Sequence, residues 1–97
     1  MSKDQSILDL LTQLQLDERG LIPIDHWDAD LCAIGIIRKG DSRRLVYIST
    51  YDKQPGRYFY ECEEAAGLQS DEYTVTGSED DVDFDRLLYA LENHLKK

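Results

Sequence analysis

"LCAIGIIRKGDSRRLVYISTYDKQPGRYFYECE", residues 31–63, is the stretch of sequence that decides the fold. It contains three runs rich in β-branched and aromatic residues, which suit a pleated, half-buried surface. The runs cover residues 31–38, 43–52 and 57–63. The links between them, KGDS and KQPG, are short, so neighbouring strands should pair antiparallel as hairpins. Pro55-Gly56 suits a type II turn, because Pro presets φ and Gly accepts a positive φ.

An amphipathic helix is predicted before this stretch, over residues 3–18. Its apolar side chains recur at helical spacing, and Gly20 follows as a stop signal. Ser2 and Gln5 fit a capping box, in which each side chain satisfies an unpaired backbone N–H at the helix start. The segment that follows, LIPIDHWDAD, is interpreted as a connector, because its Pro removes a donor and its Asp residues favour turns.

The C-terminal part of the chain predicts a fourth strand over residues 72–77 and a second helix after Asp83, its candidate N-cap. The helix has one apolar stripe, formed by Phe84, Leu87, Leu88, Leu91 and Leu95. The predicted fold is therefore a single α+β domain over residues 1–97. It is a four-stranded antiparallel meander sheet with an N-terminal and a C-terminal helix, in the order α-β-β-β-β-α.

The predicted hairpins also divide the strand residues between two sheet faces. Pairing of Arg38 with Arg43, and of Asp52 with Arg57, places one set of side chains under the helices. The opposite face then carries four large apolar residues, Ile37, Val46, Ile48 and Phe59. Either one helix covers each face, or these four residues form a contact face, since exposed apolar patches mark interaction sites. A structural homodimer joined through them is one functional hypothesis.

The charge of the chain is unevenly distributed. The net charge is −9, which argues against duplex nucleic acid and against anionic membranes as partners. Residues 61–85 contain ten acidic side chains and no Lys or Arg, so the rest of the chain is close to neutral. An acidic solubility surface is one interpretation. The other is an acidic edge that speeds association with a basic partner.

The leading hypothesis is a small protein-binding module that docks a basic protein surface through this acidic edge. We define the acidic edge by the residues expected to make contact: Asp71, Glu72, Tyr73, Glu79, Asp80 and Asp81. In size, acidity and lack of a catalytic motif, the chain is similar in general character to bacterial immunity proteins, which neutralise toxins such as basic nucleases. No motif is matched residue by residue, so the comparison implies an inhibitory role and no particular site residue.

Catalytic and metal chemistry find little support in the sequence, and neither a cofactor nor a catalytic residue is predicted. No phosphate-binding glycine loop or nucleophile elbow is present. The His and Cys residues lack the spacing of a metal site. A small enzyme that uses Glu61 or Cys62 remains a third hypothesis.

A calcium loop is also considered for the acids before the last helix. Asp81, Asp83 and Asp85 match the first ligand positions of such a loop, but Arg86 stands where a Gly is needed. Capping of the helix is the favoured interpretation, and a weak cation site is the alternative.

The remaining expectations concern location and nucleic acid. No segment resembles a signal peptide or an apolar membrane span, so a cytoplasmic protein with reduced cysteines is expected. Residues 38–57 combine six basic side chains with tyrosines, a pattern that can bind single-stranded nucleic acid. The basic residues cluster at predicted turns and strand ends, where solvated residues normally lie, so this is a minor alternative.

Overall fold

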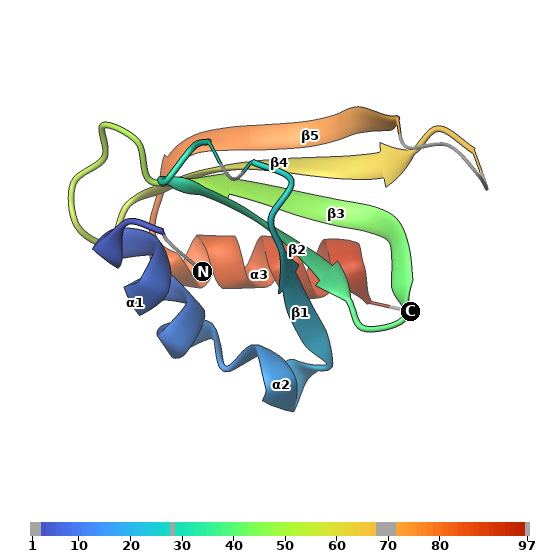
Figure 1. The fold of residues 1–97 in the computed structure, drawn as a ribbon, viewed down its shortest axis with the longest axis horizontal. Coiled ribbons are helices and arrows are strands. Elements are labelled where there is room, and N and C mark those ends of the chain that lie inside the picture. The colour runs from blue at the N-terminus through green and yellow to red at the C-terminus, as the bar shows by residue number, and fades with distance from the viewer. Residues whose placement is uncertain (1–2, 28, 68–71, 97) are drawn as a thin grey trace.

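The computed structural model describes residues 3–27, 29–67 and 72–96. Its helices are α1 (Gln5–Leu14), α2 (Leu16–Arg19) and α3 (Phe84–Leu95). Its strands are β1 (Leu21–Ile24), β2 (Ala33–Arg38), β3 (Asp41–Ser49), β4 (Tyr58–Ala65) and β5 (Tyr73–Val82). The strands form one antiparallel sheet in chain order (Figure 1). The predicted α+β fold, an antiparallel meander with helices at both ends, is thus confirmed, although the sheet has five strands where four were predicted.

The additional strand is β1, which lies in the segment interpreted as a connector. It pairs antiparallel with β2, from Leu21 opposite Arg38 to Ile24 opposite Gly35. Pro23 lies in the middle of this strand. A proline is tolerated in a strand at the sheet edge, because no further strand needs its missing N–H. The interpretation of this segment as a connector was therefore wrong for Leu21–Ile24, which form an edge strand.

The N-terminal helix is interrupted where the sequence predicts one continuous helix. Gln15 adopts a left-handed conformation with φ of 49°, and the chain restarts as α2. In a continuous helix Leu14 and Leu16 would point about 200° apart, whereas the break allows both to be buried. The start is also corrected: α1 begins at Gln5, and Asp4 is the N-cap that accepts from the Ser6 N–H. Ser2 lies outside the described residues.

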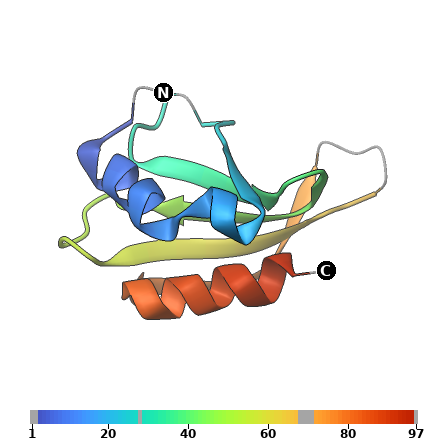
Figure 2. The same ribbon diagram turned by 90° about the horizontal axis from the view of Figure 1, so that it is seen from below.

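Both α1 and α3 pack on the same face of the sheet. One cluster of buried side chains joins Ile7, Leu10 and Leu14 of α1 to Leu87 and Leu91 of α3. The cluster also contains Ile34, Ile36, Val46, Ile48 and Tyr60 from the strands. Figure 2 is seen from this helical side of the molecule. The C-terminal helix is as predicted, with Asp83 as its N-cap and its apolar stripe turned to the sheet.

The register of β3 differs by one residue from the predicted register. Ile36 pairs with Val46 rather than with Leu45, and Val46 pairs in turn with Cys62. An irregularity between Ile37 and Arg38, next to the hairpin turn, produces this shift. Because side chains alternate between faces, a shift of one residue turns the whole of β3 over. Val46 and Ile48 are therefore fully buried under the helices, contrary to the predicted face assignment.

The last strand, β5, is longer than predicted and contains residues assigned to a loop. It extends to Val82 and includes Glu79, Asp80 and Asp81. Two irregularities in its pairing with β4 accommodate the extra residues, and Asp81 takes a positive φ of 55° at one of them. Bulges of this kind are common on edge strands, where they discourage pairing with another chain. Asp tolerates the left-handed region better than most residues.

Candidate functional site

Three members of the predicted acidic edge are bound to cations of neighbouring elements. Glu79 Oε1 lies 2.7 Å from Arg86 Nε of α3 and accepts a hydrogen bond from the Tyr60 hydroxyl. The Asp80 carboxylate lies 2.6 Å from Lys53 Nζ in the β3–β4 turn. These contacts hold the pKa of each carboxyl below its ordinary value, with the bond to Arg86 the main cause for Glu79 and that to Lys53 for Asp80.

Asp81 forms the third of these contacts. Its Oδ1 lies 3.0 Å from Arg57 Nε, and Arg57 also binds the Asp81 carbonyl oxygen. Tyr73 donates to the Ser42 carbonyl oxygen at 2.6 Å, and Glu72 is exposed. Asp71 lies outside the described residues. Much of the acidic edge thus connects β5 to the β3–β4 turn and to α3, and its charges are not all available to a partner.

An aromatic row lies on the sheet face opposite the helices. Trp27 packs edge-on against Tyr47 with ring centroids 5.0 Å apart, and Tyr47 lies 6.3 Å from Phe59. Gly35 permits this arrangement, because a Cβ there would come within 2.7 Å of the Trp27 ring and 2.8 Å of Leu45. All three aromatic side chains are only partly buried. The row crosses from the segment after β1, over β3, to β4.

The loop that carries Trp27 is held by a buried cation. The Lys3 ammonium donates to the carbonyl oxygens of Trp27 at 3.0 Å and Asp30 at 2.8 Å. It also lies 2.8 Å from the Asp25 carboxylate, and its side chain is only 1% exposed. The three N–H groups of the ammonium therefore have three acceptors. The hydrogen bond from Lys3 is the main cause of the lowered pKa of Asp25.

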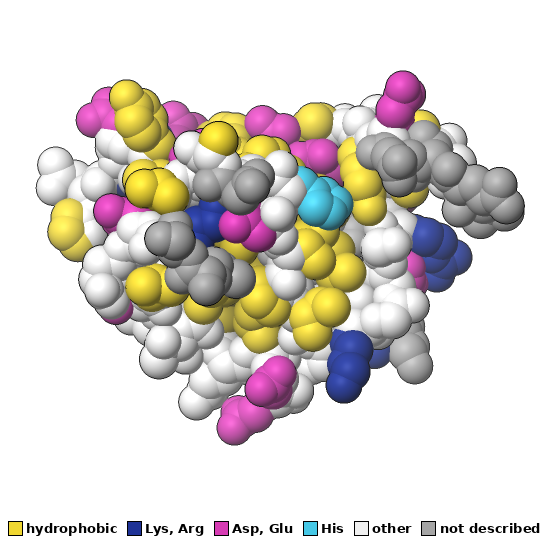
Figure 3. All heavy atoms as spheres, viewed as in Figure 1, with side chains coloured by type: hydrophobic (Ala, Val, Ile, Leu, Met, Phe, Trp, Pro, Cys, Tyr) yellow, Lys and Arg dark blue, Asp and Glu magenta, His cyan; other side chains and the backbone are white. Residues whose placement is uncertain are grey.

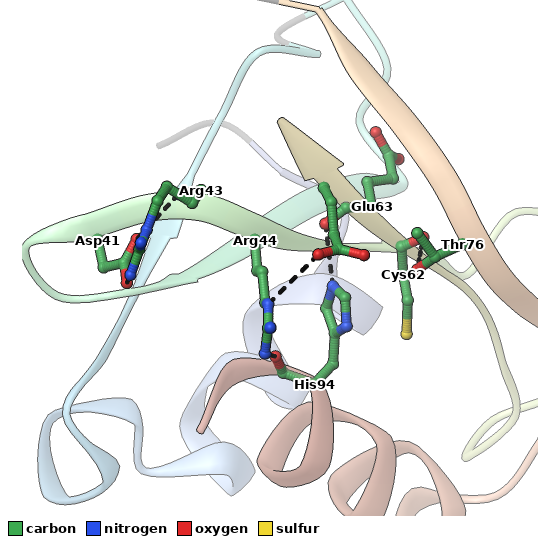
Figure 4. A network of polar contacts seen from close by, with 8 residues as sticks. Asp41, Arg43, Arg44, Cys62, Glu63, Thr76 and His94 are labelled. Carbon is green, nitrogen blue, oxygen red and sulfur yellow. Dashed lines mark hydrogen bonds and ion pairs between the residues drawn. The ribbon is translucent and has the colours of Figure 1, made fainter. Parts of the chain in front are cut away.

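Two carboxylates stand beside the aromatic row. Glu61 pairs directly with Tyr47 across β3 and β4, and Glu63 follows two residues along the same strand and face. Partial burial, and next the charge of Glu61, raise the pKa of Glu63 above its ordinary value. Figure 4 shows the Glu63 side chain turned away from α3, while its backbone carbonyl oxygen contacts His94 Nε2 at 2.9 Å.

These carboxylates differ from the acids of the acidic edge in their surroundings. Within residues 3–27, 29–67 and 72–96, neither Glu61 nor Glu63 has a cation within salt-bridge distance. We call the surface formed by Trp27, Tyr47, Phe59, Glu61 and Glu63 the open face, because no described helix packs on it.

Figure 3 looks at the molecule from the side on which the segment after β1 lies. Hydrophobic side chains gather in the centre of this view, and acidic side chains lie along its upper margin, near β4 and β5, and also at its left and lower margins. Lys and Arg side chains are most prominent toward the end of the β2–β3 hairpin. In this view the apolar groups occupy the centre, and the most visible basic groups lie toward one end.

The four residues of the predicted dimer face do not share one surface. Val46 and Ile48 are fully buried in the core, whereas Ile37 and Phe59 lie on the opposite side of the sheet. That face assignment is therefore wrong, because the register of β3 differs by one residue from the predicted register. Homodimerisation itself stays a prediction without a defined surface.

The two candidate catalytic residues lie on opposite faces of the sheet, because Glu61 and Cys62 are consecutive in β4. Burial raises the pKa of the Cys62 thiol, which favours the unreactive protonated form. Of the calcium-loop candidates, Asp81 binds Arg57 and Asp83 caps α3. No cluster of potential metal ligands occurs in the described part of the chain.

The tyrosines of the single-stranded nucleic-acid alternative do not form one platform. Tyr47 lies on the open face, Tyr51 is 72% exposed, and Tyr58 is buried in the core. Stacking of successive bases needs rings on one continuous surface. The described residues also contain no helix long and apolar enough to cross a membrane.

Comparison of the chain with protein-family models, with curated proteins and with solved structures finds no match in any of the three. The candidate site therefore rests on geometry. Neither Trp27 nor Tyr47 was predicted as a site residue from the sequence. The available signal was Gly35 in the middle of a strand, since such a glycine often marks a close approach by another group.

Proposed function

We propose that this protein is a binding module that docks a protein partner presenting Arg or Lys side chains. The contact surface we propose is the open face, with the acidic edge in a supporting role. The observation that carries the proposal is the pair Glu61 and Glu63, two carboxylates without a cationic partner among the described residues, placed beside an aromatic row. A partly buried carboxylate is stabilised when a cation is brought to it.

The chemistry of the open face favours a guanidinium group. An Arg side chain can stack on an aromatic ring and bind a carboxylate with two parallel N–H groups at the same time. Glu61 lies directly opposite Tyr47 in the sheet. Directly opposed side chains have Cβ atoms about 5 Å apart, so one guanidinium reaches both. The single Trp of the chain lies next in the row.

The acidic edge contributes at longer range. Its ion pairs are at the surface, and the chain as a whole keeps a net charge of −9. A field of this sign raises the rate at which a basic protein arrives, while short-range contacts determine how long it stays. An immunity-type inhibitor is one form of this function. In that case the protein covers the basic surface through which its partner acts.

The test uses peptides of defined composition as probes. A twelve-residue peptide that alternates Arg and Thr is titrated into the isotopically labelled full chain, and backbone amide shifts are followed by NMR. We expect the largest shifts at Tyr47, Phe59, Glu61 and Glu63, with a change in Trp27 fluorescence. A peptide with Gln in place of Arg should leave these signals unchanged. Binding should weaken as salt is added, because the contact is between charges near the surface.

Two double variants separate the open face from the acidic edge. Glu61→Gln with Glu63→Gln and Asp80→Asn with Asp81→Asn each remove two negative charges, and Asn accepts the positive φ of Asp81. We expect the first to weaken binding about tenfold or more and the second about twofold. Equal losses, or shifts confined to β5, would overturn the open face as the contact surface. Concentration-dependent shifts of the open face without peptide would show a second copy as its occupant and would also overturn the proposal.

A further inference from the structure

A basic depression lies at the end of the β2–β3 hairpin, and none of the five residues that define the open face lines it. It has a volume of about 650 Å³, and its walls come from the hairpin, the end of β4 and the C-terminal end of α3. This volume is in the range of small-molecule sites, about 300 to 1,000 Å³. Five basic side chains of the described residues line it: Arg38, Lys39, Arg43, Arg44 and Lys96. Dark blue side chains mark this end of the molecule in Figure 3.

Acidic side chains neutralise only part of this charge. Asp41 binds Arg43 through two hydrogen bonds of 3.0 and 2.9 Å, and the Glu64 carboxylate lies 3.6 Å from Arg44. No acidic partner occurs for Arg38, Lys39 or Lys96 in the part of the chain that the structure describes. The lining therefore keeps an excess of positive charge on a protein whose net charge is −9.

The end of α3 accounts for two of the basic side chains. Arg44 Nη1 donates to the His94 carbonyl oxygen at 3.4 Å, as Figure 4 shows, and Arg38 Nη1 donates to the Leu95 carbonyl oxygen at the same distance. Cations at this position stabilise the negative end of a helix. Each guanidinium has five N–H groups, so donors remain for a ligand. The contacts with α3 do not explain the two lysines or Arg43.

We propose that this depression binds a small ligand that carries a phosphate group. A phosphate offers oxygen atoms in several directions, which suits guanidinium and ammonium groups that approach from two strands and from the end of a helix. The depression is larger than a phosphate ion requires, and the partly buried Ala65 adds apolar surface to its lining. An organic part of the ligand would occupy that surface. The proposal does not depend on the open face.

The test is an NMR titration of the labelled full chain with inorganic phosphate, with adenosine monophosphate and with adenosine. We expect both phosphate compounds to shift the backbone amides of Lys39, Gly40 and Lys96, and adenosine monophosphate to bind more tightly than phosphate alone. Adenosine, which has no charge, should leave these signals in place. Shifts with adenosine equal to those with its monophosphate, or no shift at the hairpin with either phosphate compound, would overturn the proposal.

Matched variants test whether binding depends on the basic side chains of the depression or on positive charge anywhere on the protein. Lys39→Gln with Arg43→Gln removes two positive charges from the depression without touching the donors to α3. Lys53→Gln with Arg57→Gln removes two from the turn at the other end of the sheet. We expect the first pair to weaken binding of adenosine monophosphate about tenfold or more and the second less than twofold. Equal losses would show a general charge effect and would overturn the site. Lys39→Gln alone, in an exposed turn, serves if a double variant fails to fold.

Discussion

On β3, Val46 and Ile48 point into the helical core and are fully buried, whereas Tyr47 between them points to the open face. On β4, Cys62 points toward the helices, while Glu61 and its aromatic neighbours lie on the other side. The helical face is covered by mainly aliphatic side chains of the helices, which pack against the strands. The open face is covered only in part, by the loop of Trp27, and it exposes carboxylates beside rings. Neighbouring residues of one strand therefore contribute to the core on one side and to the proposed contact surface on the other.

The largest effect on the free energy of unfolding is expected when a glutamate is placed on the helical face, and the same substitution on the open face is the comparison. Val46→Glu puts a carboxylate into the dry core and should reduce the free energy of unfolding by more than about 4 kcal/mol. Tyr47→Glu removes two ring contacts on the open face and should reduce it by about 1 to 2 kcal/mol. Urea unfolding followed by circular dichroism measures both. Reversed magnitudes would mean that β3 is turned over.

The next effect concerns the contact between Trp27 and the sheet. Gly35→Val places a branched side chain where a Cβ alone comes within 2.7 Å of the Trp27 ring, so we expect a loss of about 2 to 3 kcal/mol. The fluorescence of Trp27, the single Trp, should move to longer wavelength as the ring is displaced into water. Gly77→Val is the control, because no atom lies within 4 Å of a Cβ at that strand position. Equal effects of the two substitutions would contradict the contact.

The cation that holds the Trp27 loop gives the third prediction. Lys3→Met leaves two backbone carbonyl oxygens without their donor and should reduce the free energy of unfolding by about 2 kcal/mol at pH 7. In the folded protein the contact with Lys3 lowers the pKa of Asp25 below 3.8, so this pair stabilises above that pH. The difference between wild type and variant should therefore shrink as the pH falls below about 3.8, and an increasing difference would contradict the pairing. Lys39→Met, in an exposed turn, is the control.

The smallest effect belongs to the carboxylates of the open face. Folding raises the pKa of Glu63, so its ionised form is disfavoured in the folded state, and stability is lost as the pH rises from about 4.5 through the folded pKa. Glu63→Gln should therefore stabilise the protein at pH 7, by less than about 0.5 kcal/mol after allowance for solvent screening. Below pH 4 the two proteins should be equally stable. A variant that is less stable at pH 7 would mean that Glu63 has a cationic partner.

Local sequence signals predicted some elements of this fold better than others. The N-cap and the apolar stripe of the helix Phe84–Leu95 were predicted correctly, because five apolar positions and a capping residue are local signals. The strand from Leu21 to Ile24 was missed, because a proline is tolerated only at a sheet edge and edge position is not visible in sequence. The prediction of which side of β3 is buried was wrong, because the register of β3 depends on one irregular residue pair beside the hairpin turn.

The candidate site was less predictable than the fold. The acidic stretch was visible in the sequence, but the pairing of Asp80 with Lys53 and of Asp81 with Arg57 joins residues 27 and 24 positions apart. Residues so far apart in the sequence come into contact only when the β3–β4 turn folds beside β5. Trp27 was counted as part of a connector, since nothing local shows that it lies on Gly35 of β2.

The amino-acid sequence by itself determined the fold class, the C-terminal helix and the excess of negative charge, because periodicity and composition act over a few residues or over the whole chain. The tertiary structure alone decided which side of each strand is buried, which acids are bound by cations and which remain beside an aromatic row. Those outcomes depend on strand register and on contacts between distant segments, and a shift of one residue in register exchanges the buried and exposed side chains of a strand.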